Sequence, residues 1–362
     1  MIKISPINFK GRIIDSHAHV GTLKNNNNKG KIYTKQQLDV FVKTSLPNND
    51  TVEKMLVSDI DIFHRTKPEY SGNKELIDLF KNDKKYGLIA SCSPADGNVN
   101  NIKKLYQEHP NEFLGLKFHP NIQNLPITDK KYEPYLDFAN KNKIPCLFHS
   151  AVAVDNKGKL SKVLDKFSDP EAIYSVAKKY KETPVIIAHL GAGWNEAHDR
   201  TIDVLVKSIK NNDANLYADI SWVDIDSPIK DGHKTKEHVL KLVKKLKGIG
   251  DESWTHGDQT HRILFGSDAP IDRFSDNKAR EHYSNFVDDI KFAIKNDKDL
   301  KNEADTIIDN IFYKNSEKLF LNKKTEIQNK SNNKAILIGA GIVAVISGLL
   351  LFKSNKKDSN DK

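Results

Sequence analysis

The amino-acid sequence predicts an α/β fold, a (β/α)8 or TIM barrel. Eight short runs of apolar and β-branched residues recur at intervals that leave room for one helix between each pair. Several of the intervening segments carry apolar residues three or four positions apart, as amphipathic helices do. Alternating strands and helices are typical of a parallel sheet, and eight such units close it into a barrel.

The eight predicted strands occupy residues 12–16, 54–58, 87–91, 113–118, 144–148, 184–188, 215–220 and 262–267. Helical patterns between them include residues 34–46, 102–108 and 236–246. One helix start is marked by three consecutive signals: Asp169 as N-cap, Pro170 at the first helical position and Glu171 in the first turn.

Length and composition favour one catalytic domain, which we place at residues 1–321 of the 362. Hydrophobic residues make up 38% of the chain, enough to exclude disorder of the whole chain. The net charge is +9, but no lysine- and arginine-rich stripe with interleaved aromatics occurs, so we expect no nucleic-acid partner. Cys92 and Cys146 each fall inside a strand-like run and are expected to be reduced core residues.

Titratable residues gather where the predicted strands end, and the carboxyl ends of the strands are where barrels of this kind carry their active sites. In chain order they are His17 and His19, Lys117 and His119, His149, His189, and Asp268. Strand side chains two positions apart point to the same face, so His17 and His19 can reach one cation together. We therefore expect these residues to form one site.

Imidazole nitrogens with one carboxylate suit Zn²⁺, Mn²⁺ or Fe²⁺, whereas Ca²⁺ or Mg²⁺ would require more acidic ligands than these strand ends supply. Zinc is the first choice among the three. A small-molecule substrate is the expected partner of such a site.

Four sequence blocks resemble the amidohydrolase superfamily, and most closely its amidohydrolase-related branch, which includes aminocarboxymuconate-semialdehyde decarboxylase. The blocks occur in family order and read IDSHAH at 14–19, GLKFHP at 115–120, IAHLG at 187–191 and LFGSDAP at 264–270. The resemblance spans residues 12–321 and includes a closing helix at 310–320.

The resemblance implies that His17, His19, His149 and Asp268 bind the metal, with His189 beside it as acid/base or charge stabiliser. It also implies that metal-activated water is the nucleophile and that Asp268 accepts its proton. In binuclear members a lysine placed like Lys117 is carbamylated and bridges two metals, but the Lys-x-His-Pro pattern is equally typical of members with one metal. We favour one ion over two.

Three functions are consistent with these residues. The first is hydrolysis of a C–N or C–O bond in a small substrate, and the second is non-oxidative decarboxylation of an unsaturated or aromatic carboxylic acid. The third, a non-catalytic barrel tethered to a membrane, is weakened by the completeness of the ligand set. Residues expected to bind substrate are Arg65, Lys117, His119, Arg273 and Trp222. Asp219, with Trp222 at the tip of the seventh strand, is expected to line or brace the pocket. The loops that would select the substrate carry no recognisable motif.

The C-terminal region is expected to anchor the chain in a membrane. A polar linker at 322–334 precedes 18 uncharged, mainly apolar residues at 335–352, and a short basic tail follows at 353–362. As a helix the run would measure about 27 Å, close to the roughly 30 Å of a hydrocarbon core. No apolar signal segment occurs at the N-terminus, so the barrel is expected on the cytoplasmic side. Ala340, Ala344 and Gly348 recur every four positions, a spacing compatible with a homodimer through this helix.

The anchor makes a prediction about fractionation. Full-length protein should sediment with membranes and resist extraction by high salt, because an apolar helix is held by the hydrocarbon core rather than by charge. A chain ending at Leu321 should be recovered in the soluble fraction with equal activity. Recovery of the full-length chain in the soluble fraction without detergent would contradict the anchor.

Overall fold

The computed structural model describes residues 11–25, 28–43, 46, 50–150, 165–191, 195–221, 233–269 and 276–322. The chain divides into two compact units, Met1–Leu319 and Phe320–Lys362. Since the described part of the second unit is only Phe320–Asn322, the architecture that follows is that of the first unit.

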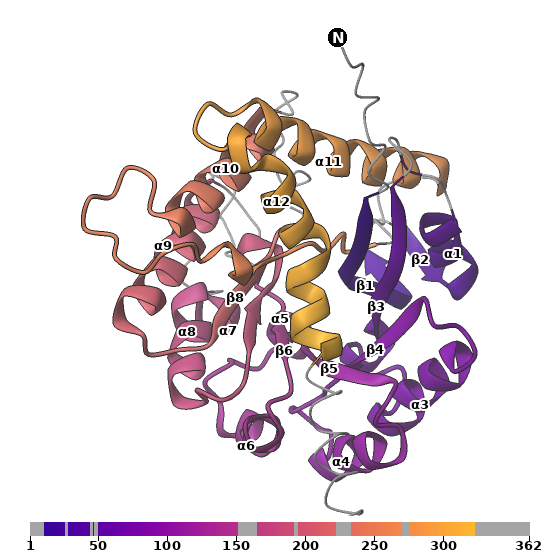
Figure 1. Cartoon of the computed structure of the whole chain (residues 1–362). Coiled ribbons are helices and arrows are strands. Elements are labelled where there is room, and N and C mark those ends of the chain that lie inside the picture. The colour runs from indigo at the N-terminus through magenta and orange to yellow at the C-terminus, as the bar shows by residue number, and fades with distance from the viewer. Residues whose placement is uncertain are drawn as a thin grey trace, which may run out of the picture. The chain divides into compact units, whose positions relative to one another are not determined.

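The predicted barrel is confirmed. Within the described residues, eight parallel strands follow one another in the sheet in chain order. They lie at the centre of the first unit, with the longer helices around them (Figure 1). The strands are β1 (Arg12–Asn25), β3 (Thr51–Asp59), β4 (Tyr86–Ser91), β5 (Phe113–Phe118), β6 (Cys146–Phe148), β7 (Val185–Ile187), β8 (Leu216–Asp219) and β9 (Ile263–Leu264). Each overlaps a strand predicted from the sequence.

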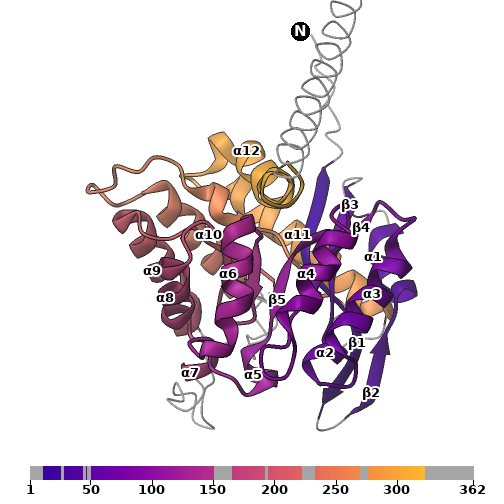
Figure 2. The same cartoon turned by 90° about the horizontal axis from the view of Figure 1, so that it is seen from below.

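One hairpin was not predicted. β1 continues past residue 16, its predicted end, to Asn25 and pairs antiparallel with β2 (Asn28–Tyr33), with Gly21 opposite Tyr33. Figure 2 shows this hairpin at the same end of the barrel as the short helices α2 (Ile60–Phe63), α5 (Pro120–Gln123) and α7 (Asp165–Ser168). It therefore borders the end at which the parallel strands terminate.

The remaining helices cover the outside of the sheet. They are α1 (Lys35–Lys43), α3 (Glu69–Phe80), α4 (Val99–Glu108), α6 (Glu133–Asn142), α8 (Pro170–Lys179), α9 (Asn195–Asn211), α10 (His233–Lys247), α11 (Asp276–Asn296) and α12 (Ala304–Asp309). The short 3-10 segments are Lys130–Tyr132, Ala188–Gly191, Thr260–Arg262 and Lys301–Glu303. The predicted closing helix is present as two π-helical turns, Asn310–Lys314 and Glu317–Asn322.

Local signals in the sequence explain where several helices begin. The Asp169 side chain accepts a hydrogen bond from the Glu171 amide at 2.7 Å, with Pro170 at the first position, so the predicted start of α8 is confirmed.

Apolar side chains on the strands are buried on both faces, as in a sheet covered by helices, and every residue of β4 and β5 is buried. Cys92 and Cys146 are free thiols in this core, as predicted.

The barrel closes between β1 and the segment that follows β9. The Ser16 amide donates to the Phe265 carbonyl at 3.0 Å, and the His19 amide donates to the Ala269 carbonyl at 2.7 Å. Beneath them, the buried Asp15 carboxylate accepts the Ser267 hydroxyl at 2.6 Å and the Ser267 amide at 3.0 Å. Backbone and side-chain hydrogen bonds thus join the first strand to the last.

Two predictions made for the C-terminal region fall outside the described residues. These are the linker, helix and tail at 322–334, 335–352 and 353–362, apart from Asn322, and the homodimer through Ala340, Ala344 and Gly348. Among the residues that are described, no helix is both long enough and apolar enough to cross a membrane.

Closure of the barrel can be tested through Ser267. We expect Ser267→Ala to lower the free energy of unfolding by about 1–3 kcal/mol, because the buried Asp15 carboxylate loses its hydroxyl donor. The control is Ser175→Ala, which removes an exposed hydroxyl that donates to the Ala172 carbonyl at 2.7 Å and should change stability by less than about 0.5 kcal/mol. Urea denaturation measures both, and equal small losses would contradict the role given to Ser267.

Candidate metal centre

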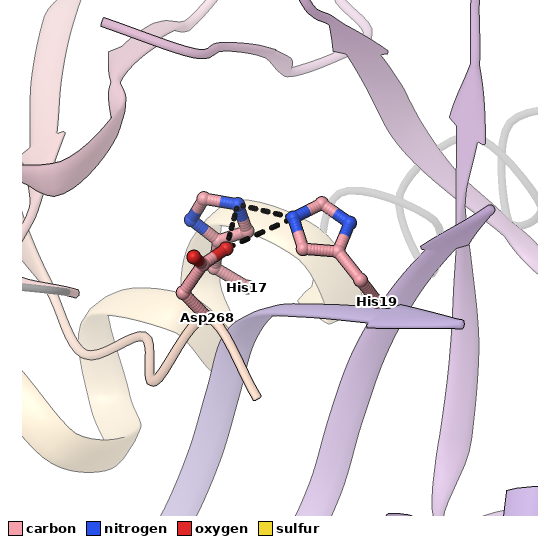
Figure 3. A group of neighbouring side chains, drawn as sticks. All are labelled: His17, His19 and Asp268. Atoms are coloured by element: carbon pink, nitrogen blue, oxygen red, sulfur yellow. Dashed lines mark hydrogen bonds and ion pairs between the residues drawn. The ribbon is translucent and has the colours of Figure 1, made fainter. Parts of the chain in front are cut away.

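Three side chains converge where the barrel closes (Figure 3). The Nε2 atoms of His17 and His19 lie 3.1 Å apart, and the Asp268 Oδ1 atom lies 2.9 Å from the His19 nitrogen and 3.3 Å from the His17 nitrogen. The side chains are 1%, 10% and 17% exposed for His17, His19 and Asp268. Two nitrogens and one oxygen are therefore held together, largely out of solvent.

The backbone explains this convergence. His17 and His19 are two positions apart on β1 and so share a face, as the sequence predicted. The Asp268 amide donates to the His17 carbonyl at 2.8 Å, and Asp268 has a φ of 57°, in the left-handed region. Gly266 allows the two segments to approach, because a Cβ at that position would lie 2.8 Å from the His17 Cβ.

Each ligand candidate on β1 is held from behind by a hydrogen bond. The His17 Nδ1 atom lies 3.0 Å from the Asp219 Oδ2 atom, and the His19 Nδ1 atom lies 2.8 Å from the Ser58 hydroxyl. A ring held at Nδ1 in this way presents the lone pair of Nε2 to a metal, an arrangement common in protein metal sites. The two Nε2 atoms are the ones that face each other.

The electrostatics of the cluster favour a cation. Burial lowers the pKa of His19 to about 4, so its ring is neutral near pH 7. Burial would raise the pKa of Asp268, but the surrounding His189, His17 and His19 lower it far below its usual range, so the carboxylate is ionised. Neutral imidazoles and an ionised carboxylate are the forms that bind a divalent metal.

The group thus fits a divalent metal ion. His17, His19 and Asp268 have their ligand atoms within 4.8 Å of one another. Two imidazoles and a carboxylate suit Zn²⁺ or Mn²⁺, and three protein ligands leave a position open, as in catalytic sites.

Lys117 lies against this group and is fully buried. Its Nζ atom is 2.6 Å from the Nε2 atom of His17. Burial lowers the pKa of Lys117 to about 8, so an appreciable fraction of the amine is neutral near neutral pH. The structure therefore places Lys117 next to His17, and its role in substrate binding or bridging stays a prediction.

His149 lies between His119 and His189. The His149 ring stacks on the His119 ring at a centroid distance of 3.8 Å, and His149 Nδ1 lies 3.0 Å from His189 Nε2. The ligand atoms that converge within 4.8 Å among the described residues do not include His149, so its role as a metal ligand stays a prediction. His119 accepts a hydrogen bond from the Ile122 amide at 3.3 Å and so caps α5.

His189 lies beside His17, with a distance of 4.8 Å between the ring centroids. Burial lowers the pKa of His189 to about 3, so this ring is also neutral. His189 has a φ of 59°, in the left-handed region, and its amide donates to the Asp219 Oδ1 atom at 2.9 Å. It therefore lies next to the cluster, and its role as acid/base or charge stabiliser stays a prediction.

The other predicted site residues are only partly described. Arg273 and Trp222 lie outside the described residues. Arg65 lines a cleft of about 400 Å³ together with Phe63, His64, Gln123 and Lys131, and its guanidinium pairs with Asp96 at 3.1 Å. The ring centroids of Phe63 and His119 lie 5.7 Å apart, so this cleft borders the histidines. A larger cleft, about 710 Å³, is lined by Gly11, Arg12 and residues of α11 and α12, and contains none of the candidate site residues.

Sequence reasoning missed two of the groups that hold the histidines. Ser58 lies near the end of β3, and Ser221 follows β8, and neither belongs to a motif. Asp219 was predicted to line or support the pocket, and the structure places it behind His17. Serines are common at strand ends, so only the folded backbone shows which ones contact a histidine.

Several solved structures share the fold. A probable 2-pyrone-4,6-dicarboxylic acid hydrolase from Acinetobacter baumannii, with citric acid bound, superposes with a TM-score of 0.52 at 14% identity over 85% of this chain and 98% of that one. An amidohydrolase from Burkholderia multivorans with bound zinc gives 0.53 at 9% identity over 85% and 99%. A 5-carboxyvanillate decarboxylase from Novosphingobium aromaticivorans, complexed with manganese and 4-hydroxy-3-methoxy-5-nitrobenzoic acid, gives 0.53 at 10% identity over 86% and 96%.

A comparison with curated protein sequences finds no match. The model of the family described as Amidohydrolase matches residues 81–321. The matched region includes Lys117, His149, His189 and Asp268, whereas His17 and His19 precede it. The protein is an enzyme, as the four sequence blocks predicted. Because the match covers more than half of the chain, the chain belongs to the Amidohydrolase family.

Proposed function

We propose that this enzyme hydrolyses a C–N or C–O bond of a small, carboxylated substrate, with one divalent metal ion, zinc by first choice, held by His17, His19, His149 and Asp268. The observation that carries the proposal is the convergence of two imidazole nitrogens and one carboxylate oxygen within 3.3 Å at the closure of the barrel. Catalytic metal sites with three protein ligands, the number that converge here, keep an open position for the reactants.

A divalent ion bound there would act as a Lewis acid and lower the pKa of a coordinated water. The chain's own residues supply the proton transfers. Asp268 is ionised and 17% exposed, so it can accept a proton from water arriving at the cluster. His189 is neutral and adjacent, so it can hold or return a proton on the other side of His17.

The substrate class rests on the cleft beside the histidines. Lys131 and Arg65, which pairs with Asp96, line it, and positively charged side chains favour an anionic substrate group such as a carboxylate. Two of the fold neighbours, by their names, act on carboxylated compounds, 2-pyrone-4,6-dicarboxylic acid and 5-carboxyvanillate. These names support a carboxylated substrate for this chain as well.

The second candidate is non-oxidative decarboxylation of an unsaturated or aromatic carboxylic acid. The same cationic cleft would hold the carboxylate, and one of the neighbours is a decarboxylase. In either reaction Arg273 and Trp222 are proposed to contact the substrate. The anchoring of this enzyme to a membrane through 335–352 stays a prediction.

The metal ligands can be tested by metal analysis. Purified full-length protein should carry about one divalent ion per chain, and His17→Ala should lose it, because one of the three converging donors is removed. The control is His261→Ala, at an exposed position on Thr260–Arg262, which should keep the full metal content. Full metal occupancy in His17→Ala would show that the assigned site is wrong, and about two ions per chain would favour a bridging Lys117.

The role of Asp268 can be tested kinetically. On a substrate found by screening lactones, amides and carboxylated aromatics, Asp268→Asn at saturating metal should lower kcat by about 100-fold or more, because the proton acceptor is lost. Product analysis separates the candidates, since hydrolysis yields an acid and an amine or alcohol whereas decarboxylation releases carbon dioxide. Turnover near that of the unmodified enzyme would exclude the proposed role of Asp268.

A further inference from the structure

A buried carboxylate outside the metal centre holds the loop that follows β4. Glu69, the first residue of α3, is 5% exposed. Its Oε2 atom accepts the Ser93 amide at 2.8 Å and the Tyr135 hydroxyl at 2.9 Å, and its Oε1 atom accepts the Asn98 amide at 3.4 Å. Glu69 therefore ties both ends of residues 92–98, the β4 loop, to α3.

The β4 loop packs closely against this carboxylate. A Cβ at Gly97 would lie 2.7 Å from Glu69 Oε2 and 2.6 Å from the Ser93 carbonyl oxygen, so any larger residue would displace the loop. Asn73, also on α3, donates from its side chain to the Ser91 carbonyl at 2.9 Å and accepts the Ser91 amide at 2.8 Å. The end of β4 and the loop after it are thus both fixed by α3.

The β4 loop contacts two positively charged side chains of the cleft beside the histidines. Arg65 Nε lies 3.1 Å from Asp96 Oδ2, and Lys131 Nζ donates to the Ala95 carbonyl at 3.0 Å. A guanidinium carries five N–H donors and an ammonium three, so each group can contact the loop and a substrate carboxylate at the same time. The loop therefore orients both cations.

A third residue of the cleft is tied to the same loop. The side-chain amide of Gln123, which is 2% exposed on α5, donates to the Cys92 carbonyl at 3.2 Å and to the Ser93 hydroxyl at 2.9 Å. Arg65, Gln123 and Lys131 come from three different segments of the chain, and the β4 loop is the element that joins them.

We propose that Glu69 is a positioning residue for substrate binding, which holds the β4 loop where Asp96 and the Ala95 carbonyl orient Arg65 and Lys131. The proposal rests on the proposed function, in which this cleft binds a substrate carboxylate. Glu69 acts through the loop and not by contact with the substrate. Its loss should therefore weaken carboxylate binding and leave the metal content unchanged.

Two substitutions separate the hydrogen bonds of Glu69 from its packing. Glu69→Leu keeps a side chain of similar size but leaves the Ser93 and Asn98 amides without their acceptor. In Glu69→Gln the amide oxygen can take the place of Oε2 and accept from Ser93 and Tyr135, so only the longest of the three hydrogen bonds is lost. We expect Gln, and not Leu, to preserve the position of the loop.

The test is calorimetric titration of full-length, zinc-loaded protein with benzoate, a simple aromatic carboxylate. Measurements at pH 8 keep Glu69 mainly ionised, because burial raises its pKa to about 7. The Kd for benzoate should rise about threefold to tenfold in Glu69→Leu, a modest change because the cations it orients are exposed, and stay near the unmodified value in Glu69→Gln.

A double-mutant cycle shows whether the effect passes through the two cations. In a protein that carries both Arg65→Ala and Lys131→Ala, benzoate binding is already weakened, and Glu69→Leu should weaken it no further. A further loss of the same size in that background would overturn the proposal.

Gly97→Ala provides a second route to the same result at an exposed position of the loop, where folding should tolerate the change. Because the added Cβ pushes the loop away from Glu69, the Kd for benzoate should rise as in Glu69→Leu. The matched control is Asp78→Ala, which removes an exposed carboxylate of α3 that pairs with Lys74 at 2.6 Å and should leave the Kd unchanged.

An unchanged Kd in Gly97→Ala and in Glu69→Leu would overturn the positioning role. A failure of the proposed substrate class looks different: the unmodified protein would then bind benzoate no more tightly than the protein that lacks Arg65 and Lys131, and the role of Glu69 in substrate binding would fall with it.

Discussion

The pairing of β1 with the segment after β9 is the constraint on which the rest of the site depends. Parallel backbone bonds join Ser16 to Phe265 and His19 to Ala269, and they set the register of the first strand against the last. In that register the Asp268 amide meets the His17 carbonyl, so the Asp268 carboxylate lies next to both rings. The step that closes the barrel is therefore also the step that assembles the donors, and a barrel that failed to close would have no site.

Burial of this cluster has a cost that a bound cation would offset. Asp219 and Asp268 are ionised and enclosed, His19 and His189 are neutral, and the buried Lys117 lies next to the donors. Removing carboxylates from water costs several kcal/mol each unless opposite charge and hydrogen bonds compensate. A divalent ion between His17, His19 and Asp268 would supply that charge. Burial lowers the pKa of His19 and His189, so these rings are in the neutral form that can bind a metal.

Much of the barrel could be predicted from the sequence because its signals are local. Apolar runs, helix periodicity and the Asp169–Pro170 start depend on neighbouring residues, and strand alternation placed His17 and His19 on one face. The β1–β2 hairpin was missed because polar residues 22–31 lack a strand pattern. Ser58 and Ser221 could not be identified, since their contacts with the rings arise only after strands distant in sequence pack together. His149 was predicted as a ligand by resemblance, and in the structure its Nδ1 atom lies 3.0 Å from the Nε2 atom of His189.

The most direct test of the central claim is the position of the metal itself. Crystals of the metal-loaded enzyme, measured at the zinc absorption edge, should show one anomalous peak within about 2.0–2.2 Å of the Nε2 atoms of His17 and His19 and a carboxylate oxygen of Asp268. A peak elsewhere in the chain, for example in the cleft beside Arg12 and α11, with none between these three side chains, would contradict the account.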